Sequence, residues 1–414
     1  MAKPSVTSTY HSSGALSLDE LVDSLVVGHR SSHDAPSNSG PSTCLASTRL
    51  LIDDEMGALE ALMQGEEDLV QLDCLREWLD QELVRLQSCF AERGEPRPSW
   101  ASGHPRMALC DNQRLVMINA LDLDPDDALT SRSLDSGFDV AALLVGLAIR
   151  GETRLANRAL DRYLLLSGDY GLTRILSVLQ VVRALSGARR ALQRRAGMTP
   201  GEPLARIADA VAMSRRYLAL AEKISVFRFP PLIIGAGVSG SGKSRFTANM
   251  VESLGAVRLC SDVERRRLFG IHPQASGAEP PVDIFTGNAT TRTYQRLAEL
   301  AGTLLDAGFI TCVDATCLAR DQRELLCHQA EARGLPVLIV SFEADDETLK
   351  ARIVRRAQRQ GVLPRVSLEV LRRQQSLFEP FDAEERQHLV HLDTTAADAT
   401  KTLASLIQQR IFAA

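Results

Sequence analysis

Residues 237–244 read Gly-Val-Ser-Gly-Ser-Gly-Lys-Ser, and this stretch decides the fold. Its spacing, G-x-x-x-x-G-K-[ST], is that of a phosphate-binding P-loop. The glycines allow the backbone to curl so that several N–H groups point into one concavity, which attracts anions. The lysine can reach the β- and γ-phosphates of a nucleotide, and the hydroxyl of the last serine can bind Mg²⁺. The motif therefore predicts ATP and Mg²⁺ as cofactors. The residues expected to bind them are Gly237, Ser239, Gly240, Ser241, Gly242, Lys243 and Ser244, of which Ser244 is also an expected metal ligand.

The residues on either side of the motif support this prediction. The prolines at 230 and 231 end the preceding element, and residues 232–234 form a short apolar run typical of a buried parallel strand. After the motif, Phe246, Met250 and Leu254 recur at every fourth position, which predicts an amphipathic helix. The positive N-terminal end of that helix favours a bound phosphate. Strand, glycine-rich loop and helix follow one another in the order that a P-loop requires.

Composition limits the class of protein. The chain has 414 residues, 45% of them hydrophobic, and a net charge of −5, which fits two or three globular domains and gives no overall basic charge for nucleic acid. The cysteines are scattered without metal-ligand spacing, so we expect reduced thiols in a cytoplasmic protein and no structural zinc. No apolar run approaches the ~20 residues that span a bilayer, and the N-terminus lacks the pattern of a secretory signal.

Three regions are predicted along the chain. Residues 1–48 are rich in serine and are expected to be mostly disordered, with helical potential only over 16–27. Residues 49–228 are predicted to be mostly helical, interrupted by a strand pair or one long strand over 114–123. Residues 229–414 alternate strands with helices, which predicts an α/β domain whose parallel sheet has helices on both faces and the strand order 2-3-1-4-5. The expected strands of this domain are 232–234, 256–260, 309–313, 336–342 and 388–392.

Two carboxylates follow predicted strands of this sheet. Asp262 comes directly after the second strand, where it could accept a proton from an acceptor hydroxyl, and Arg265 lies one helical turn further on, where it could hold an anionic substrate. The alternative for this stretch is a helix cap made by Ser261 or Asp262, which is compatible with a catalytic role. Asp314 ends the third strand at the Walker B position and is a predicted ligand of Mg²⁺.

An arginine-rich helix is predicted over residues 346–360. In small kinases such a helix forms a lid whose arginines neutralise charge on the transferring phosphoryl group. We favour Arg352 and Arg356 for that role. The alternative is a solvated charged face, which is the usual meaning of a charge run.

Four stretches, 237–244, 258–267, 290–300 and 313–316, together resemble a bacterial family of predicted ATP-binding kinases. In that family an aminoglycoside-phosphotransferase-like domain precedes a P-loop kinase domain, which is itself similar to phage polynucleotide kinase, zeta toxins and chloramphenicol phosphotransferase. The resemblance implies that Asp262 is the catalytic base and that Arg265 binds substrate phosphate.

The region 49–228 resembles the C-terminal lobe of the aminoglycoside-phosphotransferase-like half, through residues 134–144, 156–158 and 163–170. Its catalytic motif, His-Gly-Asp-x-His-x-x-Asn followed by a metal-binding Asp, is degenerate. The alignment places Ser102 at the base, His104 at the second His, Met107 at the Asn and Asn119 at the metal-binding Asp. We therefore interpret this half as a pseudokinase domain, retained as a scaffold or as a module that binds a substrate or partner.

The sequence leads to one main functional hypothesis and two alternatives. The main hypothesis is an ATP- and Mg²⁺-dependent phosphotransferase acting on a small-molecule or nucleotide-like hydroxyl, with Lys243, Asp262, Arg265, Asp314, Arg352 and Arg356 as its catalytic residues. The first alternative is an ATP-binding switch that needs no base at Asp262. The second is a nucleic-acid 5′-end kinase, which the net negative charge disfavours. No membrane partner and no particular oligomeric state are predicted.

Overall fold

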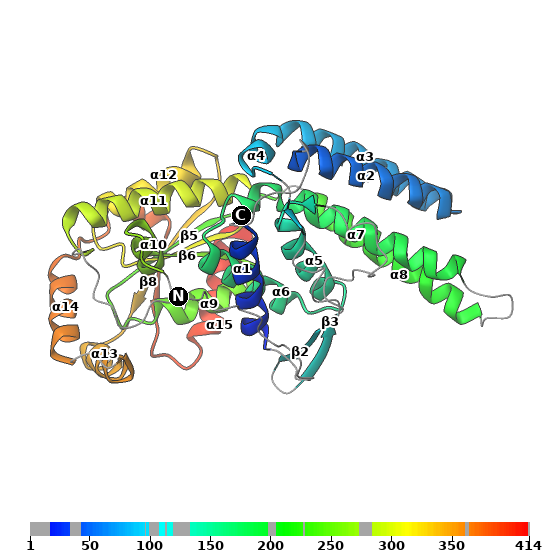
Figure 1. Cartoon of the computed structure of the whole chain (residues 1–414). Helices are drawn as coiled ribbons and strands as arrows, with labels where there is room; N and C mark the ends of the chain where they lie inside the picture. The colour runs from blue at the N-terminus through cyan, green and yellow to red at the C-terminus, as the bar shows by residue number, and fades with distance from the viewer. Residues whose placement is uncertain are drawn as a thin grey trace, which may run out of the picture.

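The computed structural model describes residues 17–33, 43–95, 97–98, 107–111, 114–118, 133–197, 204–226, 228–272, 284–360 and 364–412. These residues form a helical N-terminal part and a C-terminal part built around one sheet (Figure 1). No helix in these ranges is long and apolar enough to cross a membrane.

The C-terminal part contains a five-stranded, all-parallel sheet. Its strands are β5 (Leu232–Ala236), β6 (Val257–Cys260), β7 (Thr311–Asp314), β8 (Val337–Glu343) and β9 (Leu389–Asp393). The spatial order is β6-β7-β5-β8-β9, which is 2-3-1-4-5 along the sheet, and every neighbouring pair is parallel. The predicted α/β fold and strand order are confirmed. Every residue of the central strand β5 is buried, as an aliphatic strand covered on both faces must be.

Helices cover both faces of this sheet because successive strand residues point to opposite sides. Leu232 and Ile234 of β5 pack in one hydrophobic cluster with α11 (Gly287–Asp306) and α12 (Arg320–Glu331). Ile233 packs in a second cluster with α9 (Lys243–Leu254) and α15 (Ala399–Ile407), which lie on the other side of the sheet in Figure 1. The remaining helices of this part are α10 (Ser261–Leu268), α13 (Asp346–Gln360) and α14 (Pro364–Ser376), and a short π-helical segment, Gln408–Phe412, follows α15.

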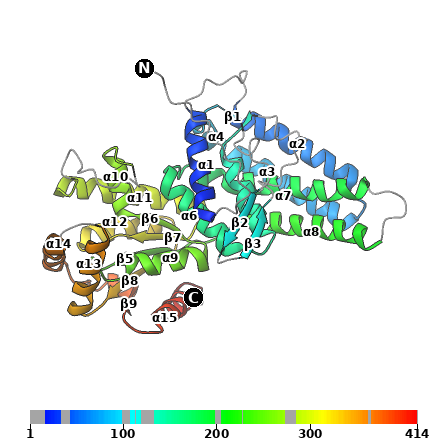
Figure 2. The same cartoon turned by 60° about the horizontal axis from the view of Figure 1, so that its bottom comes forward.

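The N-terminal part is mostly helical, as predicted. Its long hairpin of α7 and α8 extends away from the sheet, with α2 and α3 alongside (Figures 1 and 2). The helices are α1 (Leu18–His33), α2 (Cys44–Leu62), α3 (Glu66–Arg85), α4 (Gln87–Glu92), α5 (Gly137–Ala148), α6 (Thr153–Ser167), α7 (Leu172–Ala196) and α8 (Leu204–Ser225). Two short strand pairs accompany them: β1 (Arg97–Pro98) with β4 (Ser133–Leu134), and β2 (Met107–Asp111) with β3 (Arg114–Ile118).

The helix α1 confirms the helical potential predicted over residues 16–27, and it continues to His33. Leu18, Val22 and Leu25 are fully buried, and α1 packs along α6. Ion pairs such as Arg162 with Asp23 reinforce that contact. The stability of α1 comes from burying one apolar face against α6 rather than from local propensity. Residues 1–16 and 34–42 lie outside the described ranges.

A correction concerns the strand expected over 114–123. Only Arg114–Ile118 is a strand within the described residues, and its antiparallel partner is the preceding segment, Met107–Asp111. Residues 119–123 are not among those described, and neither are Ser102, His104 and Asn119 of the degenerate motif. Met107, the fourth aligned position, begins β2.

The two parts of the chain share a continuous interface through α6. The Asp161 carboxylate of α6 accepts hydrogen bonds from the backbone N–H of Arg258 in β6, at 2.9 Å, and from its guanidinium, at 3.3 Å. The Asn157 amide donates to the carbonyl of Glu252 in α9, at 3.2 Å. One hydrophobic cluster runs from the N-terminal helices into the sheet, so the helical part directly supports the sheet that carries the P-loop.

Candidate nucleotide and phosphoryl-transfer site

The P-loop has a backbone that only glycine tolerates at its key positions. Gly237, Gly240 and Gly242 have φ values of 141°, 85° and 99°, in the region that L-residues avoid. A Cβ on Gly237 would lie 2.7 Å from the carbonyl oxygen of Phe342, so the neighbouring strand β8 also excludes a side chain there. The loop predicted from spacing therefore adopts a tight conformation that depends on these glycines.

Lys243 begins α9 and lies inside this loop. Its ammonium donates hydrogen bonds to the carbonyl oxygens of Gly237, at 2.8 Å, and Val238, at 2.9 Å. Burial lowers the pKa of Lys243, and the negative charge of Asp314 is the main effect that opposes this decrease. The lysine is thus fixed in the centre of the loop, with a carboxylate close enough to favour its charged form.

Asp314 ends β7 beside the start of α9, and it is buried. The hydroxyl of Thr247, one helical turn after Lys243, donates to the Asp314 carboxylate at 3.4 Å and contacts the carbonyl oxygen of Ser244 at 3.3 Å. Thr247 thus contacts both the Asp314 carboxylate and the backbone of Ser244, the two residues predicted to bind Mg²⁺. A hydroxyl and a carboxylate are oxygen donors of the kind Mg²⁺ takes, usually one or two from the protein with phosphates and water completing the shell. Within the described ranges, no group of three or more His, Cys, Asp and Glu side chains could hold a metal ion.

Asp262 is exposed in the first turn of α10, directly after β6. The negative charge of Asp262 also opposes the decrease in the pKa of Lys243. The alternative of a capping role is wrong, because Cys260 is the N-cap residue of α10 and no side chain caps that end. The Asp262 carboxylate therefore remains available at the same edge of the sheet as the P-loop.

Arg265 is buried one turn further along α10. It donates from Nη1 to the carbonyl of Ile284, at 2.9 Å, and to the hydroxyl of Thr290, at 3.2 Å. Its guanidinium lies 5.5 Å from the ring centroid of Phe285. Burial lowers the pKa of Arg265, which Asp262 partly offsets. These contacts fix Arg265 against the beginning of α11.

The helix that carries Asp262 is anchored by the helical part of the chain. Glu264 is buried and pairs with Arg267 one turn later, while the Tyr170 hydroxyl donates to the same carboxylate at 3.2 Å. Arg267 also donates to the carbonyl oxygen of Leu165 in α6, at 2.7 Å. The orientation of the candidate base therefore depends on residues about a hundred positions away in sequence.

The two expected lid arginines occupy different places. Arg352 donates to the carbonyl of Gly240 in the P-loop, at 3.2 Å, and to the hydroxyl and carbonyl of Thr394, at 2.9 and 3.2 Å. Arg352 therefore links the P-loop to Thr394, the residue that follows β9. Arg356 is exposed one turn away, and its charge contributes to the lowered pKa of Lys243.

Three functional contacts were not predicted from the sequence. Thr247 could have been found, because it follows Lys243 by four positions and so shares its helix face. Gln374 of α14 accepts a hydrogen bond from the N–H of Ser239 in the P-loop, at 2.7 Å, and Thr394 binds Arg352. Neither of these two carries a local sequence signal.

Lys243, Asp262 and Asp314 follow or end the neighbouring parallel strands β5, β6 and β7, so all three lie at the carboxyl edge of the sheet. The charges of Asp314, Asp262 and Arg356 also act on the lysine. Open α/β sheets bind their ligands at this edge. The arrangement joins a phosphate-binding loop, a cation, a buried metal-ligating carboxylate and an exposed carboxylate that can accept a proton.

Comparison with known proteins covers mainly this part of the chain. Residues 232–381 match a family model described as an AAA domain. A crystal structure of a gluconokinase from Sinorhizobium meliloti 1021 is 23% identical, with 44% of this chain and 96% of that chain covered and a TM-score of 0.31. An unliganded sugar kinase from Janibacter sp. HTCC2649 is 20% identical, with 44% and 94% covered and a TM-score of 0.32. No curated protein matches the chain.

With TM-scores of 0.31 and 0.32, these two structures carry no conclusion about the fold or function of this chain. The family match begins at β5 and does not extend into residues 49–228, so the aminoglycoside-phosphotransferase-like resemblance of that region stays a prediction. The P-loop, the strand order and the family match agree with one another. The C-terminal part of this chain is a P-loop α/β domain that matches the model of an AAA domain over residues 232–381.

Proposed function

We propose that this protein is an ATP- and Mg²⁺-dependent phosphotransferase that moves the γ-phosphoryl group of ATP to a hydroxyl of a small molecule. The observation that carries the proposal is the convergence of Lys243, Asp314 and Asp262 at one edge of the sheet. A nucleotide-binding switch needs the first two. Group transfer to a hydroxyl also uses a carboxylate that accepts the hydroxyl proton, and Asp262 is exposed at the same edge for that task.

Each residue then has a defined task. The loop N–H groups and Lys243 bind the β- and γ-phosphates, and Ser244 with Asp314 would hold Mg²⁺. Mg²⁺ held by these two residues would supply positive charge to the phosphate groups. Asp262 accepts the proton of the acceptor hydroxyl while the new bond from that oxygen to the γ-phosphorus forms and the bond from phosphorus to the β–γ bridging oxygen breaks, releasing ADP.

The arginines fall into three roles in this proposal. Arg356 supplies positive charge to the transferring phosphoryl group from the exposed face of α13. Arg352 keeps the P-loop in shape through Gly240 and Thr394. Arg265, fixed beside Asp262, gives the acceptor side a positive charge suited to an acceptor that carries an anionic group.

The test is ADP formation measured with ATP and Mg²⁺ across a panel of hydroxyl acceptors: sugars, polyols, nucleosides, aminoglycosides and an oligonucleotide with a 5′-hydroxyl end. Wild type is compared with Lys243→Ala and Asp262→Asn. Asp321→Asn is the matched control, because Asp321 is also an exposed aspartate in the first turn of a helix of this domain.

We expect one acceptor class to stimulate turnover. Asp262→Asn should lower that stimulated rate about 10²- to 10⁴-fold, the usual worth of a general base, with unchanged affinity for a fluorescent ATP analogue. Asp321→Asn should behave as wild type. Acceptor-stimulated turnover that survives in Asp262→Asn would overturn the base assignment. ATP binding without stimulation by any acceptor would favour the switch, and stimulation by the oligonucleotide alone would favour the nucleic-acid end kinase.

A further inference from the structure

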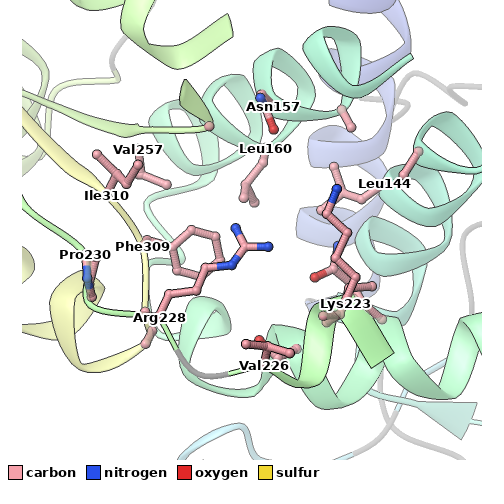
Figure 3. Close-up of a pocket in the computed structure, with 18 of the residues that line it drawn as sticks. Leu144, Asn157, Leu160, Lys223, Val226, Arg228, Pro230, Val257, Phe309 and Ile310 are labelled. Carbon is pink, nitrogen blue, oxygen red and sulfur yellow. The ribbon is translucent and has the colours of Figure 1, made fainter. Parts of the chain in front are cut away.

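A cavity of about 960 Å³ lies between the helical part and the sheet, away from the P-loop. Its sheet side is formed where strands begin: Pro230 precedes β5, Val257 opens β6, and Phe309 and Ile310 precede β7 (Figure 3). The candidate nucleotide site lies at the other ends of these same strands. The cavity is therefore separate from that site, and its volume is within the range of small-molecule pockets.

The walls of the cavity are largely apolar. On the helical side Leu144 comes from α5 and Leu160 from α6, and they lie opposite Val257, Phe309 and Ile310 in Figure 3. Trp78 of α3 also lines the space. Such walls favour the apolar body of a ligand, because contact removes apolar surface from water on both sides.

Two cations enter this space from opposite sides. Lys223 is near the C-terminal end of α8, and Arg228 follows it in the connection to β5; both side chains extend into the cavity in Figure 3. Within the described part of the chain, neither side chain makes a hydrogen bond or an ion pair.

The acidic residues of the lining do not balance these two charges. Glu82 is paired with Arg85, at 2.8 Å from Oε1 to Nε. Asp306 is paired with Arg333, which lies outside the lining, at 2.6 Å from Oδ1 to Nε. Both carboxylates therefore already have a cation. The positive charges of Lys223 and Arg228 have no free counter-ion among the described residues of the cavity lining.

We propose that this cavity binds a small amphipathic anion. A carboxylate or phosphate group accepts hydrogen bonds from Arg228 and Lys223, and an apolar body packs against Leu160, Phe309 and Ile310. Charge-assisted hydrogen bonds are stronger than neutral ones, and they fix the orientation of a ligand whose affinity comes largely from apolar burial. The site does not depend on the proposed phosphotransferase activity, and its test needs no turnover.

The probe is 10-bromodecanoate, whose bromine quenches the fluorescence of a tryptophan that it contacts. The chain has two tryptophans, Trp78 and Trp100, so a Trp100→Phe background leaves Trp78 in the cavity wall as the reporter. Quenching is titrated in this background and in the double variant Lys223→Gln/Arg228→Gln. The matched control removes two other exposed cations, Lys401 and Arg410 of the C-terminal segment, by Lys401→Gln/Arg410→Gln.

We expect saturable quenching with a micromolar Kd. The double variant should raise that Kd at least tenfold, Arg228→Lys should keep it within threefold, and the control pair within twofold. The cation 10-bromodecyltrimethylammonium, which has the same apolar chain, should bind at least tenfold more weakly than the anion. Equal binding of the cation, an unchanged Kd in the double variant, or no saturable quenching in the reference protein would each overturn the proposal. Near-native thermal unfolding of the double variant checks that its fold is intact.

Discussion

Arg352 gives the sharpest test of how the phosphate site is held together. Its guanidinium makes three hydrogen bonds, one to Gly240 of the P-loop and two to Thr394 after β9. Arg352→Gln removes all three, while the P-loop sequence itself is unchanged. We expect weaker nucleotide binding, because the loop then populates conformations that cannot bind phosphate and the apparent Kd rises as the competent fraction falls.

The size of the effect follows from these contacts. Hydrogen bonds that involve a charged group contribute ~1.5–3 kcal/mol when buried, but Arg352 is partly exposed and water replaces part of what is lost. We therefore assign about 2 kcal/mol to the whole set, which is about 30-fold in a binding constant. Thr394→Val removes the hydroxyl contact with Arg352, together with the hydrogen bond that this hydroxyl donates to the carbonyl of Glu343, and should cost about fivefold.

Affinity is measured by titrating a fluorescent ATP analogue with Mg²⁺, which needs no acceptor. Arg355→Gln is the matched control, because Arg355 is exposed on the same helix and of the same charge. A Kd for Arg352→Gln within twofold of wild type would refute the supporting role. An equal loss in Arg355→Gln would mean that general charge matters rather than these contacts. A large loss in Arg352→Gln with no effect of Thr394→Val would indicate that Arg352 binds the nucleotide directly.

Three further predictions concern the metal and two buried ion pairs. Removing Mg²⁺ with EDTA should weaken binding of the ATP analogue by wild type at least tenfold, and Asp314→Asn should reduce that dependence to less than threefold. Burial raises the pKa of Asp161, although the positive charge of Arg258 opposes this increase. The folded state therefore binds the Asp161 proton more tightly than the unfolded state does. As a result, the free energy of unfolding falls as the pH rises from the unfolded-state pKa to the folded-state pKa. Arg258→Gln should therefore cost about 3–5 kcal/mol at pH 7 in urea denaturation, and the loss should shrink toward pH 5; a loss that grows on acidification would contradict this sign. Glu385→Gln leaves the fully buried Arg323 without its carboxylate partner and should also cost about 3–5 kcal/mol by urea denaturation, whereas a change below about 1 kcal/mol would mean that the two carbonyl contacts of Arg323 suffice.

Most of what could be predicted about the sheet came from local sequence motifs. The strands of the C-terminal part begin and end within a few residues of their expected positions, because aliphatic runs bounded by turn residues are a signal within one short window. The extent of the helix α1 was underestimated and the partner strand of β3 was not identified. Both depend on contacts with segments that the local pattern does not contain.

Sequence alone determined the P-loop, the alternation of strands and helices, and the carboxylates that follow β6 and β7. Each of these is encoded in consecutive residues, since glycine spacing sets the backbone angles of the loop and strand ends place side chains at one edge of a parallel sheet. Only the tertiary structure decided that Arg352 contacts Gly240, 112 positions away in sequence, and that Gln374 binds Ser239, 135 positions away. It also decided that Lys223 and Arg228 line a cavity at the opposite edge of the sheet, where the strands begin. Such contacts arise from how whole helices pack, and no short stretch of sequence specifies packing between elements so far apart along the chain.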